Sequence, residues 1–152
     1  MTKSTRIASS LAPAILSAAL VTSIGFAKPA SQAPYSPTDA ERARWTMSDM
    51  RSLATALESY AKDNHAYPAG ATIDAMVAAV QPNYMRKAHA TDAWGRAYVY
   101  APGPEGKSYR LVSAGADGKT DPGSWESAGP LDAFEDDAVL DSGSMTRPWP
   151  FR

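Results

Sequence analysis

The chain has 152 residues and nearly balanced charge, with 15 Lys plus Arg against 16 Asp plus Glu. This balance excludes a strongly basic nucleic-acid-binding protein, so no nucleic acid is expected among its partners. The chain has no cysteine and two histidines, His65 and His89. Disulfides, thiolate metal sites and multi-histidine metal centres are therefore excluded as well.

The first 27 residues have the layout of a secretory signal peptide. Lys3 and Arg6 give a short basic start, residues 11–21 form an uncharged apolar run, and small residues precede a cut after Ala27. The run is short for a membrane-spanning helix, which needs about 20 residues. We therefore expect cleavage, an extracytoplasmic location, and membrane contact only if this segment is retained as an anchor.

A proline-rich stretch over residues 28–37 predicts an extended linker, followed by one domain over residues 38–152. A long helix is expected to begin at Thr38, whose hydroxyl can form a capping box with Glu41. Apolar side chains then recur at helical spacing and make one stripe. Asn64 is expected to end this helix in a left-handed cap.

A second, shorter helix is predicted from Thr72 to Val80, because Pro82 cannot continue it. β-branched and aromatic residues then indicate antiparallel strands joined by a hairpin. The order of elements predicts an α+β fold, in which a long N-terminal helix packs on a small antiparallel sheet. The strands are expected at residues 97–101, 109–113 and near 138–140, with a short extended piece at 148–150.

Half of the carboxylates lie between residues 117 and 141, where eight acidic residues accompany a single lysine. The three consecutive acids over residues 135–137 repel one another unless a cation or solvent screens them. Such hard oxygen ligands suit Ca²⁺, and the turn over residues 116–118 can aim a carboxylate and carbonyls at one point. Composition alone leaves a solvated acidic loop as the alternative.

The sequence contains no nucleophile elbow, no phosphate-cradling glycine loop and no H-E-x-x-H motif. His65 and His89 are expected to be ordinary surface histidines. Trp94 and Tyr98 are expected to pack in the core rather than to form a binding surface. We therefore do not expect an enzyme.

Six short segments occur in an order that matches a known family. The DAWGRAYVY segment corresponds to the family pattern D-P-W-G-x-P-Y-x-Y, and YRLVSAGADG corresponds to Y-x-x-x-S-x-G-A-D-G. Over about residues 45–142 the ordered set resembles the C-terminal domain of the type II secretion system protein G family, the major pseudopilins. The segments are residues 49–51 (DMR), 56–60 (ALESY), 63–68 (DNHAYP), 92–100 (DAWGRAYVY), 109–118 (YRLVSAGADG) and 135–139 (EDDAV).

The resemblance implies a pilin-like fold and a calcium ion that holds the loop before the last strand. Carried over to this sequence, Asp117, Asp136 and Asp137 would supply carboxylates, and Ala114 would supply a backbone carbonyl. The resemblance also implies an assembly role with protein partners from a type II secretion or pilus-like envelope machine. The location would be the periplasm of a Gram-negative-type bacterium, its exterior or its inner membrane.

The N-terminal region departs from the family pattern. Family members carry a leader of the type G-F-x-x-x-E and then a long apolar helix, whereas Gly25-Phe26 is followed by a prolyl segment without the glutamate. Ordinary filament packing depends on that apolar helix. A second hypothesis is therefore a free-standing extracytoplasmic calcium-binding interaction module that is not built into a filament.

Overall fold

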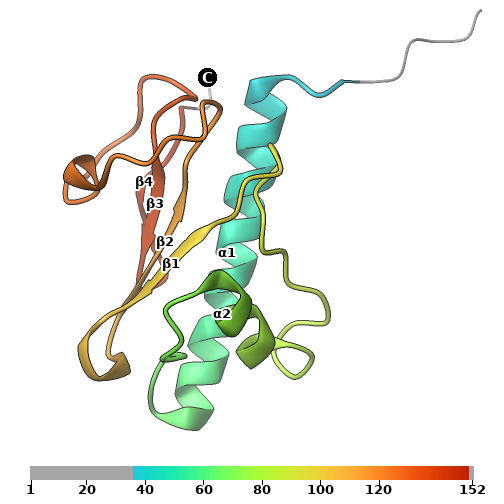
Figure 1. The fold of residues 1–152 in the computed structure, drawn as a ribbon, viewed down its shortest axis with the longest axis vertical. Helices are drawn as coiled ribbons and strands as arrows, with labels where there is room; N and C mark the ends of the chain where they lie inside the picture. The colour runs from blue at the N-terminus through green and yellow to red at the C-terminus, as the bar shows by residue number, and fades with distance from the viewer. Residues whose placement is uncertain (1–35, 151–152) are drawn as a thin grey trace, which may run out of the picture. The chain divides into compact units, whose positions relative to one another are not determined.

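The computed structural model describes residues 36–150, so the expected signal peptide and most of the linker lie outside the described residues. The domain places one helix, α1, along one face of a four-stranded antiparallel sheet (Figure 1). Each strand pairs with its neighbours in sequence, in the order β1-β2-β3-β4. The predicted α+β fold is therefore confirmed. The elements are α1 (Asp39–Asn64), α2 (Ile73–Val80), β1 (Val99–Pro102), β2 (Tyr109–Ser113), β3 (Ala138–Asp141) and β4 (Ser144–Arg147).

The capping box at the start of α1 forms as predicted. Glu41 N donates to Thr38 Oγ1 at 3.3 Å, and Thr38 N donates to Glu41 Oε2 at 2.8 Å. The left-handed cap lies one residue later than expected, at His65, whose φ is 59°. Asn64 is the last residue of the helix, and its side-chain amide donates to Tyr60 O at 2.9 Å. The helix thus ends where the sequence indicates, with a different residue in the cap.

The core lies between α1 and the inner face of the sheet. Along β2, Tyr109 and Leu111 join the core cluster with α1, whereas Arg110 and Val112 point to the other face. That outer face is covered by the loop over residues 114–137, which Figure 1 shows on the side of the sheet away from α1. The largest fully buried side chains of α1 are Met47, Met50, Leu53 and Leu57.

One strand boundary needs correction, and one strand was not predicted. β1 begins two residues later than predicted, because Ala97 forms an isolated bridge with Thr91 instead. The fourth strand was not predicted, and it lies just before the expected extended piece at 148–150, which forms no regular element. A two-residue turn makes this hairpin, with Ser142 at φ 44° and Gly143 at φ 85°. Positive φ at both positions is typical of type I′ hairpins, in which glycine is preferred.

A cluster of tyrosines fastens the segment after α1 to the sheet. The ring centroids of Tyr67 and Tyr109 lie 4.7 Å apart, and those of Tyr100 and Tyr109 lie 6.1 Å apart. Tyr67 OH donates to Glu58 Oε1 at 2.8 Å, and Tyr100 OH donates to Pro68 O at 2.9 Å. These contacts hold the chain against α1 where it turns back from the helix.

This cluster makes stability depend on pH at the alkaline end. Burial and the neighbouring Glu58 raise the pKa of Tyr67 to about 12, and burial raises the pKa of Tyr100 to about 12. Between about pH 10 and 12 the unfolded chain loses protons that the folded chain keeps, so the free energy of unfolding should fall there. Urea denaturation at about pH 9 and 11 measures this fall. Tyr67→Phe should make it smaller, and an unchanged fall would contradict the assignment.

Candidate functional site

The predicted ion ligands lie on two loop segments that the structure places side by side. One is the turn over residues 114–118, which follows β2, and the other is the segment over residues 133–137, which precedes β3. Ala116 N donates to Phe134 O at 2.7 Å and ties the two segments together. The structure therefore brings both halves of the predicted ligand set to one region.

Gly115 sits where these two segments touch. Its φ is +61°, and a Cβ at this position would lie 2.8 Å from Asp136 O and 3.1 Å from Glu135 O, and closer still to Phe134 O. Only glycine fits this conformation and this close approach. The carbonyl oxygens of the second segment thus converge on the turn, and backbone carbonyls are ligands that Ca²⁺ accepts.

The two ligands predicted on the turn make local hydrogen bonds. Ala114 O accepts from Gly118 N at 3.2 Å, which closes the turn. Asp117 Oδ1 accepts from Lys119 N at 2.9 Å, and its other oxygen lies 3.8 Å from the Lys119 ammonium. Asp117 is exposed, so its carboxylate is free to exchange these partners for solvent or an ion.

The two ligands predicted on the second segment differ in burial. Asp136 is exposed, and its Oδ2 accepts from Ala133 N at 3.3 Å. Asp137 is only 3% exposed, and its Oδ2 accepts from Asp121 N at 2.7 Å and from Trp125 Nε1 at 2.5 Å. Its Oδ1 is buried and has no hydrogen-bond partner among the described residues. A buried acceptor without a partner is costly, and more so when it carries charge.

This donor set suits a hard divalent cation that binds carboxylate and carbonyl oxygens together. Within residues 36–150, no group of three or more His, Asp or Glu side chains lies close enough to hold a metal. An ion bound here would therefore depend on backbone carbonyls as well as on the unpaired oxygen of Asp137.

A second buried carboxylate, that of Asp92, stabilises the turn that precedes β1. Its Oδ1 accepts from Trp94 N at 3.0 Å and from Arg96 N at 2.9 Å, and its Oδ2 accepts from Ser113 Oγ at 2.7 Å. Asp92 is only 6% exposed. The carboxylate thus joins the D-A-W-G turn to the end of β2, beside the predicted ion ligands.

Replacing Asp92 by alanine should lower the free energy of unfolding by about 3 kcal/mol, because three donors lose a charged acceptor. Chemical denaturation measures the loss. Asp63→Ala provides a control, since Asp63 is exposed near the end of α1 and its loss should cost less than about 0.5 kcal/mol. Equal losses for the two variants would contradict the structural role of Asp92.

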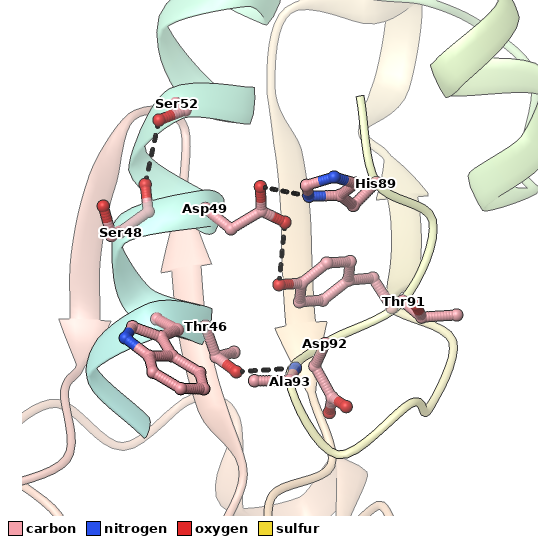
Figure 2. A pocket seen from close by; sticks show the side chains of 10 residues that line it. Thr46, Ser48, Asp49, Ser52, His89, Thr91, Asp92 and Ala93 are labelled. Atoms are coloured by element: carbon pink, nitrogen blue, oxygen red, sulfur yellow. Dashed lines mark hydrogen bonds and ion pairs between the residues drawn. The ribbon is translucent and has the colours of Figure 1, made fainter. Parts of the chain in front are cut away.

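A groove of about 500 Å³ runs beside α1 and contains a third polar cluster (Figure 2). Asp49 Oδ1 lies 3.1 Å from His89 Nδ1, and Tyr98 OH donates to Asp49 Oδ2 at 3.1 Å. Burial and then the charge of Asp49 raise the pKa of Tyr98. Thr46 Oγ1 accepts from Ala93 N at 3.1 Å on the same side of the helix.

An Asp–His pair can activate a nucleophile, but the contacts in the groove do not form a catalytic triad. Ser52 Oγ donates to Ser48 O at 3.0 Å, within the helix. Among the described residues, no serine or threonine hydroxyl forms a hydrogen bond with His89. The pair of Asp49 and His89 therefore ties the loop after α2 to α1, and His89 remains a surface residue.

The aromatic predictions are confirmed. Tyr98 belongs to the buried core, and Trp94 packs against it with an edge-on contact to Trp149, their ring centroids 5.3 Å apart. The sequence alone indicates no role for Asp49, Asp92 or Arg96, although each lies in one of the family segments. The D-A-W-G sequence is a signal for a turn in which an aspartate accepts backbone N–H groups.

Together, the helix on an antiparallel sheet and the acid-rich loop before the last hairpin define a pilin-like α+β domain. Residues 35–128 match the family model described as type II secretion system (T2SS), protein G. The match covers 94 of 152 residues, more than half, and the chain belongs to this family. Searches of curated proteins and of solved structures gave no match. Within residues 36–150, neither helix is long and apolar enough to cross a membrane.

Proposed function

We propose that the chain is a non-enzymatic, pseudopilin-like structural and assembly protein of the type II protein secretion system. The observation that carries this proposal is the family match over residues 35–128, on a domain whose helix packs on an antiparallel sheet. Proteins of this family have a structural role in the bacterial envelope. The expected partners are therefore other protein components of the secretion system, and the expected location is extracytoplasmic.

We also propose that a calcium ion stabilises the loop between β2 and β3. The support is the unpaired, buried Oδ1 of Asp137, which lies on the segment whose backbone carbonyls approach the turn at Gly115. The proposed ligands are Ala114 O and the carboxylates of Asp117, Asp136 and Asp137, and binding would have to draw these three carboxylates together, because they do not form such a group among the described residues. Bound there, Ca²⁺ would neutralise part of the acidic loop and fasten it to the end of β2.

Cross-linking the full chain in its native envelope, followed by purification, tests the assembly role. Cross-links to type II secretion components are expected. A soluble monomer without any such partner would contradict the proposal and favour the free-standing calcium-binding module. The prolyl segment before α1 makes this alternative worth measuring in the same experiment.

The intact mass of the purified chain separates two forms of the protein. A mass that fits a start at Lys28 indicates signal-peptidase cleavage and supports the free-standing module. A mass that fits a methylated start at Phe26 indicates prepilin processing and supports assembly into a filament. Both positions follow Gly25 and lie outside the described residues.

A further inference from the structure

The side chain of Arg96 forms hydrogen bonds with the turn that follows β2. Its Nη1 donates to Gly115 O at 3.1 Å, and its Nη2 donates to Ala116 O at 2.6 Å. The guanidinium also lies against Gly118, where an added Cβ would collide with the arginine Nε. The planar guanidinium therefore donates to two consecutive carbonyls of the turn, and the arginine side chain also lies against Gly118.

Hydrogen bonds between its own backbone and Asp92 hold Arg96 in place. Its backbone N donates to Asp92 Oδ1 at 2.9 Å, and its carbonyl accepts from Asp92 N at 2.7 Å. Asp92 in turn accepts from Ser113 Oγ at 2.7 Å, just before the turn begins. The guanidinium thus extends from a rigid backbone rather than from a freely moving loop.

The turn is fastened on both sides. The carbonyls of Gly115 and Ala116 face Arg96, and Ala116 N faces the other way and donates to Phe134 O. The orientation of the turn therefore sets how Ala114 and Asp117 meet the segment over residues 133–137.

We propose that Arg96 is a positioning residue that orients this turn for the ion before the ion binds. The inference rests on the calcium site proposed above. Arginine suits the task because its fork donates to two acceptors at fixed geometry, whereas a lysine ammonium is a single flexible point charge. A preorganised site binds its ligand more tightly because less of the chain has to be ordered on binding.

Calorimetric titration of the full chain with CaCl₂ tests the inference with three variants. Arg96→Met should lower calcium affinity by about tenfold or more, because the turn loses both tethers. Arg96→Lys should lower it as well, although the charge is kept. Arg86→Met is the matched control, because Arg86 is exposed in the loop after α2. The calcium affinity of this variant should equal that of the wild type.

Amide hydrogen exchange in EDTA gives a second readout that needs no ion. Exchange at Ala116 and Gly118 should be faster in Arg96→Met than in Arg86→Met, because the turn opens more often. Arg96→Lys also guards against misfolding as an explanation, since it replaces the fork with a side chain of similar length.

The outcomes separate the two proposals. If the wild type binds no calcium, the ion site is wrong, and faster exchange in Arg96→Met would still show that Arg96 tethers the turn. If the wild type binds calcium and Arg96→Met binds it equally well, the positioning role is overturned and the ion site stands. If Arg96→Lys binds calcium with the affinity of the wild type, the paired hydrogen bonds of the guanidinium do not position the turn.

Discussion

Replacing Trp149 by alanine is expected to lower the free energy of unfolding by about 4 kcal/mol, typical of a large aromatic side chain lost from a core. Trp149 is only 1% exposed and packs edge-on against Trp94. Its Nε1 also donates to Asp136 O at 3.0 Å. For a domain of this size the melting temperature should fall on the order of 15 °C, which calorimetry measures.

Two further substitutions show which part of this loss comes from burial. Trp45→Ala removes the same side chain from a site that is 50% exposed, and it should cost less than about 1 kcal/mol. Trp149→Phe keeps a ring in the core but leaves Asp136 O without its donor, so an intermediate loss is expected. A loss for Trp149→Ala as small as that for Trp45→Ala would contradict the placement of the C-terminal segment.

Removing calcium is the second change expected to have a large effect. A ligand that binds only the folded chain stabilises it by about 2.7 kcal/mol at a concentration one hundred times its Kd. The melting temperature of the full chain should therefore be clearly higher in about 1 mM CaCl₂ than in EDTA. Equal melting temperatures in the two buffers would contradict the proposed ion site.

A pair of variants tests whether Asp137 is the central ligand. Asp137→Asn should abolish the difference between calcium and EDTA, because the buried oxygen loses its charge. Asp132→Asn removes the same charge from an exposed position in the same loop and should keep the difference. If both variants keep it, Asp137 does not bind the ion; if both lose it, the effect comes from the overall charge of the loop.

Local chemistry explains which parts of the fold could be predicted from the sequence. The capping box of Thr38 and Glu41 and the stop before Pro82 depend on residues close in the chain, and both helices form where expected. β2 was predicted with its observed bounds, because Tyr109–Ser113 is the segment that returns after the hairpin loop. β4 was missed because Ser144–Arg147 has no strand pattern of its own and is ordered by pairing with β3. The Ser142-Gly143 dipeptide was the available signal for that hairpin.

The candidate site was predictable in composition but not in geometry. Counting acids identifies the loop, and the family pattern selects the four ligands, but neither shows that Asp137 is buried while Asp136 is exposed. That difference arises because Asp121 N and Trp125 Nε1, from the intervening loop, both donate to Asp137. The hydrogen bonds from Arg96 to the turn also join residues that are distant in sequence, and the spacing of residues does not predict such contacts.

The position of Trp149 also has a consequence for how the protein is made. Trp149 packs on Trp94, and Trp94 Nε1 donates to Asp39 Oδ1 at 2.8 Å, at the first residue of α1. The first residue of α1 is therefore linked, through Trp94, to a residue more than one hundred positions later in the chain. This long-range part of the core can form only after residue 149 has been added to the chain.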